Sequence, residues 1–204
     1  MDVLVVTGGI GSGKSEVCRI IQEESGCGLY NADTNVKKLY DSYPSLLDGI
    51  EDLTGCLLRD EDGRFVPSRL SEKIFSDKEL LDQVEALVFP VLTEDFRKWS
   101  EKYAEDKFVI FESATILEKP LLSGFGDKVI LVDAPMHVRL ERACRRDSLS
   151  SDQIKRRMMN QTMMNDISEG RIRPQADAVI LNVGSLDELR RDTLSVIDNF
   201  YGHI

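Results

Sequence analysis

The feature that most constrains this chain is a glycine-rich run directly after a short apolar segment. Residues 3–6 are apolar, and the pattern G-x-x-x-x-G-K-S follows, with its fixed positions at Gly8, Gly13, Lys14 and Ser15. Apolar residues then recur at helical spacing until the next glycine. A strand, a glycine-rich loop and a helix in this order are the context of a phosphate-binding loop.

The residue types explain how such a loop holds a polyphosphate. Glycines let backbone N–H groups surround the negative charge, and the helix that begins near Lys14 adds the positive end of its dipole. We expect Lys14 to reach the β- and γ-phosphates and the Ser15 hydroxyl to hold Mg²⁺. A flexible glycine turn is the alternative, but strand, spacing, lysine and serine all agree with nucleoside triphosphate binding. The expected nucleotide-binding residues are Gly9, Ile10, Gly11, Ser12, Gly13, Lys14, Ser15 and Glu16.

The distribution of charge limits the kinds of molecule that the chain is expected to bind. The 204-residue chain has a formal net charge of −10, which argues against nucleic acid as a partner. Residues 139–173 are locally basic, with nine Lys or Arg against five Asp or Glu. This segment suits a small polyanion, although a solvated helix face would have the same composition.

Other features of the composition indicate a cytoplasmic protein. No apolar run approaches the roughly 20 residues of a membrane span, and the chain begins with a strand rather than a signal peptide. The four cysteines lack C-x-x-C spacing, so we expect reduced thiols; the two histidines are too few for a histidine-based metal cluster. We expect a monomer or weak homo-oligomer that binds no membrane.

Strands and helices alternate along the chain. Further apolar runs, expected to be strands, lie at 27–33, 108–111, 129–132 and 178–181. Together with the first run, they predict an α/β fold with a five-stranded, doubly wound parallel sheet. Between the second and third strands, residues 44–104 indicate a mostly helical insertion with one hairpin around Asp62-Gly63. We expect Pro90 to end or kink a helix there, and Ser76 to cap it.

Ligands of such sheets bind beyond the carboxyl ends of the strands, where Asp33, Glu112, Asp133 and Asn182 are expected. A carboxylate there can accept the proton of an acceptor hydroxyl, and Asp33 is the natural candidate. An N-cap for the following helix explains Asp33 equally well. Glu112 or Glu118 can orient magnesium through water, or can be an ordinary surface or capping residue.

Three arginines, Arg142, Arg145 and Arg146, share one short helical stretch before a loop. Guanidinium groups placed there can close over the phosphates and neutralise the charge of the transition state. Solvated arginines on a helix surface would show the same spacing, so both interpretations stay open on the residues alone.

Several motifs of the chain, in this order, resemble the dephospho-coenzyme A kinase family. They are T-G-G-I-G-S-G-K-S at 7–15, A-D at 32–33, R-R-D at 145–147, Gln161 and A-D-A-V-I-L-N at 176–182. The resemblance implies transfer of the γ-phosphate of ATP, with Mg²⁺, to the 3′-hydroxyl of dephospho-coenzyme A, the last step of coenzyme A synthesis. It also implies a P-loop kinase fold: a core of about 1–43, 105–142 and 171–204, a substrate-binding insertion of about 44–104, and a lid of about 143–170.

The resemblance also implies roles for single residues. Asp33 takes the position of the catalytic base, Arg146 belongs to the lid, and Asn182 with its following turn lies near the adenine. Independently of the resemblance, we expect Lys14 and Arg146 to take part in catalysis and Arg142 to contact the nucleotide. Ser15 is the expected magnesium ligand.

The chain departs from the family pattern at a few positions. Asn31 stands where many relatives have Asp, so Asp33 would act as base alone. Phe89 precedes Pro90 where His is usual, so no substrate contact is expected from it. Two other functions stay open: a P-loop kinase of another small acceptor, such as a nucleoside monophosphate, and a non-kinase nucleotide-dependent switch. An obvious N-K-x-D guanine-recognition motif is missing, which disfavours the switch.

Overall fold

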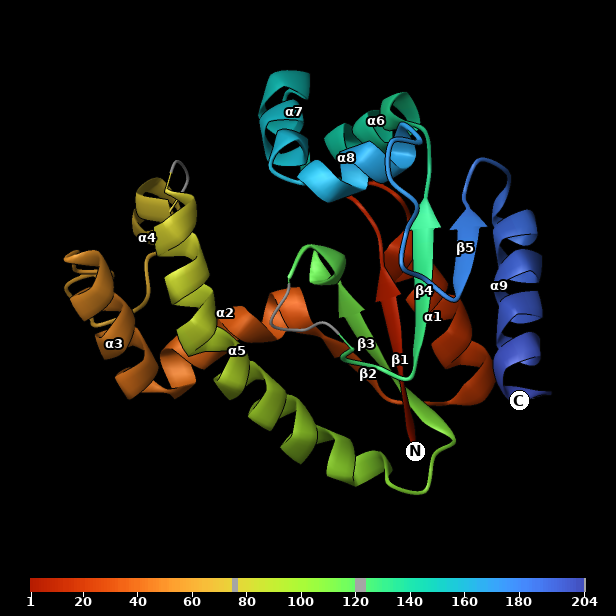
Figure 1. Cartoon of the computed structure of the whole chain (residues 1–204), viewed down its shortest axis with the longest axis horizontal. Coiled ribbons are helices and arrows are strands. Elements are labelled where there is room, and N and C mark those ends of the chain that lie inside the picture. The colour runs from red at the N-terminus through yellow and green to blue at the C-terminus, as the bar shows by residue number, and fades with distance from the viewer. Residues whose placement is uncertain (75–76, 120–123, 204) are drawn as a thin grey trace. The chain divides into compact units, whose positions relative to one another are not determined.

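The centre of the fold is a parallel sheet with the strand order β2-β3-β1-β4-β5 (Figure 1). The structure is a computed structural model that describes residues 1–74, 77–119 and 124–203. In these ranges the strands are β1 (Asp2–Thr7), β2 (Leu29–Asn31), β3 (Phe108–Ser113), β4 (Lys128–Asp133) and β5 (Ala178–Leu181). The predicted five-stranded parallel sheet is therefore confirmed.

The register of the sheet brings several strand ends to one edge. β1 pairs with β3 on one side and with β4 on the other, so that Val6 lies opposite both Glu112 and Ile130. β3 is buried along its whole length, as its continuous apolar run predicts. β5 is an outer strand of the described sheet, with Val179 and Leu181 exposed.

Helices α1 (Lys14–Ser25) and α9 (Leu186–Tyr201) lie side by side and contribute to one apolar core with the sheet (Figure 1). Between β4 and β5 the chain forms α6 (Met136–Asp147), α7 (Ser151–Met159) and α8 (Thr162–Ser168). Two 3₁₀ turns, η1 (Glu101–Tyr103) and η2 (Ile116–Glu118), lie before and after β3 in the sequence. Capping boxes are formed at Ser150, before α7, and at Ser185, before α9. None of the helices in the described ranges has the length and apolar character needed to cross a membrane.

The chain divides into two compact units, one of residues 1–31 and 103–204 and one of residues 32–102, called unit 1 and unit 2 below. Unit 2 is helical, with α2 (Ala32–Ser42), α3 (Pro44–Thr54), α4 (Pro67–Ile74) and α5 (Lys78–Ser100). The predicted division into core, insertion and lid is a different partition of the chain and stays a prediction.

Helix α5 continues through Pro90 and does not end there. Its buried apolar residues recur on both sides of the proline, so packing outweighs the missing hydrogen bond; they are Val84, Val88, Leu92 and Phe96. The helix begins after Asp77, whose side chain accepts a hydrogen bond from the Leu80 N–H at 2.9 Å. The expected cap, Ser76, lies outside the described residues.

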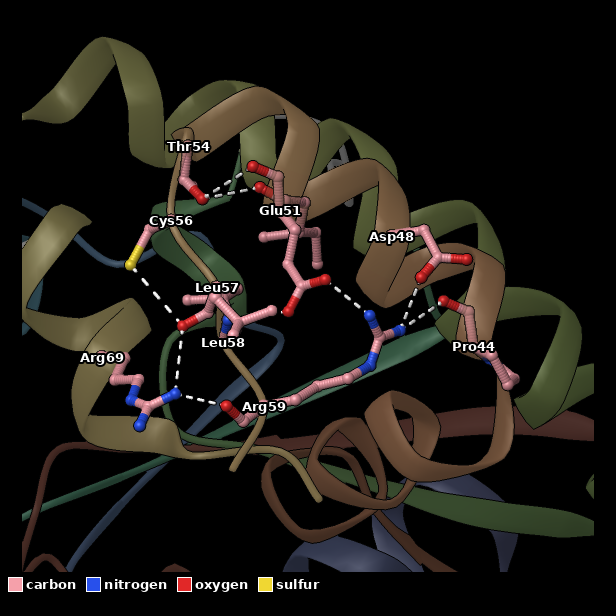
Figure 2. A network of polar contacts seen from close by, with 10 residues as sticks. Pro44, Asp48, Glu51, Thr54, Cys56, Leu57, Leu58, Arg59 and Arg69 are labelled. Carbon is pink, nitrogen blue, oxygen red and sulfur yellow. Dashed lines mark hydrogen bonds and ion pairs between the residues drawn. The ribbon is translucent and has the colours of Figure 1, made fainter. Parts of the chain in front are cut away.

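The predicted hairpin in unit 2 is confirmed as a short antiparallel bridge between Arg59 and Phe65. A polar network fixes it to α3 (Figure 2). Glu51 accepts hydrogen bonds from the buried Leu58 N–H at 2.7 Å and from the Arg59 guanidinium at 2.5 Å. Asp48 accepts a second one from Arg59 at 2.7 Å. Glu51 thus satisfies a buried backbone donor and a cation with one carboxylate.

We expect Glu51→Ala to destabilise unit 2 by about 1–3 kcal/mol, because the buried Leu58 N–H would lose its acceptor. Urea unfolding measures the loss, and hydrogen exchange at the Leu58 amide should become faster. Asp48→Ala is the matched control: Asp48 is 62% exposed and binds the same arginine, so its loss should cost about 0.2–1 kcal/mol. A Glu51→Ala protein no less stable than the control would contradict this account.

Candidate active site

The phosphate loop connects β1 to α1 and leaves backbone donors available at the start of the helix. Gly13 is the N-cap of α1, with a φ of 100°, and no side chain caps the helix. The N–H groups of Glu16 and Val17 both donate to the Gly13 carbonyl. The earliest N–H groups of a helix have no partner within it, so an uncapped glycine start is well suited to bind an anion.

Asn182 and Arg142, both predicted to contact the nucleotide, meet beside this loop. The buried Asn182 amide donates to the Ser12 carbonyl at 2.9 Å, and Arg142 donates to the Asn182 backbone carbonyl at 3.1 Å. A Cβ at Gly13 would overlap the Asn182 amide nitrogen, so the loop can approach only with glycine there. The structure therefore joins β5, α6 and the phosphate loop through one polar chain.

Ser15, the expected magnesium ligand, contacts Glu112, one of the two glutamates expected to orient the metal. Its hydroxyl donates to Glu112 Oε1 at 2.5 Å, and Asn31 Nδ2 donates to Glu112 Oε2 at 2.7 Å. Glu112 is 2% exposed. Glu118 instead accepts a hydrogen bond from the Met164 N–H at the start of α8, at 3.2 Å. Of the two carboxylates, Glu112 is the one in contact with the loop serine.

The donors around Ser15 fit a hard divalent cation. A hydroxyl and a carboxylate are oxygen ligands of the kind that Mg²⁺ prefers, and it commonly takes its remaining ligands from phosphates and water. Among the described residues there is no cluster of three or more His, Cys, Asp or Glu able to hold a metal by itself.

Two other predicted residues are already engaged with charged neighbours. Glu16 accepts hydrogen bonds from Arg19 on the same helix, and these lower the pKa of its carboxyl. Arg146 donates two hydrogen bonds to Asp147, at 2.6 and 3.0 Å, which lower the pKa of that carboxyl. Arg146 therefore pairs with its own neighbour at the end of α6.

Asp33 and Lys14 complete the predicted set. Asp33 lies in the first turn of α2 and is exposed; it belongs to unit 2, whereas the phosphate loop belongs to unit 1. Lys14 is the first residue of α1 and is half-buried. Asp133, at the end of β4, accepts a hydrogen bond from the Ser168 hydroxyl at 2.7 Å.

Two residues that contact the loop had no role in the sequence interpretation. Gln161 is 4% exposed, and its Oε1 accepts a hydrogen bond from the Ile10 N–H at 2.8 Å. Arg139 is fully buried, with its guanidinium against Gly9. Gln161 is one of the residues that carry the family resemblance, and this resemblance could have indicated a role for it in the site. Arg139 carried no signal, because an arginine on an amphipathic helix usually faces solvent.

Comparisons with known proteins agree with this geometry. A family model described as dephospho-CoA kinase matches residues 3–188. A dephospho-CoA kinase of Porphyromonas gingivalis is 36% identical over 185 residues, which cover 89% of this chain and 86% of the relative. A crystal structure of a Thermus thermophilus protein has a TM-score of 0.79 at 25% identity and covers 98% of both chains.

A solved dephospho-CoA kinase from Campylobacter jejuni has the same fold, with a TM-score of 0.55 at 23% identity, over 97% of this chain and 96% of that one. The fold is thus that of the P-loop kinases. Since the family model spans nearly the whole sequence, and the loop, Asn182 and Gln161 meet in one site, the chain belongs to the dephospho-CoA kinase family.

Proposed function

We propose that this chain transfers the γ-phosphate of ATP to the 3′-hydroxyl of dephospho-coenzyme A. The observation that carries the proposal is the family match over residues 3–188, on a chain whose phosphate loop has the required local geometry. The chemistry of phosphoryl transfer asks the protein mainly to position the reactants and to stabilise charge.

The loop binds the polyphosphate of ATP. The N–H groups at the start of α1 face no capping side chain, and Lys14 adds a cation at the same helix end. Asn182 fixes the loop by its hydrogen bond to Ser12, and Arg142 holds Asn182 in turn. We propose that both residues also contact the nucleotide.

Ser15 and Glu112 are the residues that would hold the magnesium ion, Ser15 directly and Glu112 through its contact with the hydroxyl. Mg²⁺, when bound, neutralises charge on the phosphate oxygens. Asn31 keeps the second Glu112 oxygen in place, at 2.7 Å, so the carboxylate is oriented before the nucleotide arrives.

Asp33 is the proposed base that accepts the proton of the 3′-hydroxyl. It follows β2 by two residues, and Asn31 at the end of β2 contacts Glu112. Arg146 is the proposed cation that closes on the transferred phosphoryl group, for which it must exchange Asp147 for a phosphate oxygen. We further propose that the protein works in the cytoplasm as a monomer or weak homo-oligomer, without a nucleic acid partner.

The first test is ADP release by the purified protein with ATP and Mg²⁺, with and without dephospho-coenzyme A. We expect strong stimulation by dephospho-coenzyme A and little by nucleoside monophosphates or shikimate. Stimulation by another acceptor would support kinase activity but would contradict dephospho-coenzyme A as the substrate. Hydrolysis that no acceptor stimulates would favour a nucleotide-dependent switch.

We expect Asp33→Asn to lower kcat by about 10²–10⁴-fold with little change in the KM of either substrate, because a general base acts in the transition state. Steady-state kinetics at saturating ATP measures it. Asp187→Asn is the matched control, since Asp187 is also exposed in the first turn of a helix, α9, and should keep normal turnover. Near-normal kcat in the Asp33 variant would reject the base.

We expect Glu112→Gln to raise the Mg²⁺ concentration needed for half-maximal activity by about tenfold, since weakening an outer-sphere contact typically costs 10–100-fold in metal affinity. Excess Mg²⁺ should restore much of the rate. Glu118→Gln should behave like the unmodified protein, because an amide oxygen can still accept the Met164 N–H. The same Mg²⁺ dependence in both variants would argue against a role of Glu112 in metal binding.

A further inference from the structure

Arg139 lies on the first turns of α6, and its side chain packs against the phosphate loop. A Cβ at Gly9 would overlap the Arg139 Nη1 atom, and a Cβ at Gly11 would overlap the Arg139 backbone carbonyl. One residue of α6 therefore contacts two glycines of the loop, one through its guanidinium and one through its backbone. The side chain is 0% exposed, although arginine is seldom fully buried unless paired.

The guanidinium is incompletely satisfied. Nη2 donates to Asn165 Oδ1 at 3.1 Å and lies 3.6 Å from the Met136 sulfur. Nε and Nη1 are buried and have no hydrogen-bond partner among the described residues. Buried donors are nearly always paired, so two unpaired donors on one charged group call for a physical explanation.

The positive charge of the Arg139 guanidinium is also poorly compensated by nearby carboxylates. None of the ion pairs found in the described ranges involves Arg139, and the Asp133 carboxylate acts on it only at longer range. Burial lowers the pKa of the Arg139 guanidinium, and Asp133 partly opposes this. Arginine keeps its proton in proteins, so the cation persists and its desolvation destabilises the nucleotide-free protein.

We propose that the buried charge of Arg139, held against the phosphate loop, is compensated by the bound polyphosphate, so that it strengthens nucleotide binding in proportion to the phosphate charge. Without nucleotide, the cation is desolvated and incompletely paired. A polyphosphate on the loop supplies several negative charges across a layer of protein from which water is excluded, where charges interact more strongly than in water. Arg139 thus lowers the stability of the nucleotide-free protein and raises its affinity for nucleotide.

A purely structural role would have a different signature. If Arg139 only fills space behind Gly9, its replacement would make the loop less ordered. The binding of ATP, ADP and AMP would then weaken equally. An electrostatic role instead scales with the charge of the ligand, so that ATP loses more affinity than ADP, and ADP more than AMP. It also survives replacement by lysine, which retains the charge with different hydrogen bonding.

The test is calorimetric titration of the whole chain with ATP, ADP and AMP, without acceptor, for the variants Arg139→Met and Arg139→Lys. We expect Arg139→Met to weaken ATP binding about tenfold, ADP less and AMP within about twofold, where tenfold equals about 1.4 kcal/mol. Arg139→Lys should keep ATP affinity within about threefold of normal. The nucleotide-free Arg139→Met protein should melt at a temperature no lower than the unmodified protein.

Arg190→Met is the matched control, because it removes the same charge from a partly exposed arginine of unit 1. Arg190 pairs with Glu23 and Glu24 near the end of α1. At 1.5 Å per residue this lies about 15 Å along the helix from Lys14. We expect its nucleotide affinities to stay within about twofold of normal, since exposed charges beyond a Debye length of about 8–10 Å are largely screened.

Equal losses for all three nucleotides, a lower melting temperature of nucleotide-free Arg139→Met, or an Arg139→Lys protein as weak as Arg139→Met would each overturn the inference. The inference rests on the proposed binding of ATP by this loop. If the unmodified protein does not bind ATP, the proposed function itself fails. If it binds ATP and Arg139→Met binds equally well, only the inference about Arg139 fails.

Discussion

The central place of β1 in the sheet is the constraint on which the rest of the site depends. β1 is paired on both sides, with β3 and β4, so its carboxyl end cannot shift without breaking two ladders of hydrogen bonds. The phosphate loop leaves the sheet at this fixed point. The same register places Glu112, near the end of β3, within reach of the loop serine, and this proximity does not depend on a flexible segment.

The loop is then fixed by side chains from elements that are distant in sequence. Asn182 follows β5, Gln161 directly precedes α8, and Arg139 lies on α6; each contacts a different part of the loop. A glycine-rich segment has high conformational entropy, so it needs such outside contacts to hold one shape. The conformational freedom that glycine brings is thus removed by polar contacts from the other half of unit 1.

Much of the fold could be predicted because its signals are local. Continuous apolar runs give the buried strands, and Ser150 and Ser185 with their partners three residues later give two helix starts. At Pro90 the local rule allows an end or a kink of the helix, and it cannot weigh the apolar stripe that continues α5 beyond the proline.

A motif with fixed spacing predicts part of the candidate site, the loop from Gly9 to Ser15, and the structure has the expected strand, loop and helix there. The site was not predicted where a role depends on tertiary position. The sequence cannot show that Arg139 is buried, since the same helical pattern would place it in water, nor that Glu112 rather than Glu118 contacts Ser15. The roles of Asp33 and Arg146 stay predictions from the family resemblance.

The outer strand β5 has a consequence for how the protein behaves at high concentration. Exposed apolar side chains on an outer strand, as β5 is in the described sheet, are features through which sheets of different molecules join. At four residues, the strand offers only a few backbone hydrogen bonds to such a neighbour. Because β5 is short, it limits pairing between the sheets of two molecules, and a longer β5 would favour such association.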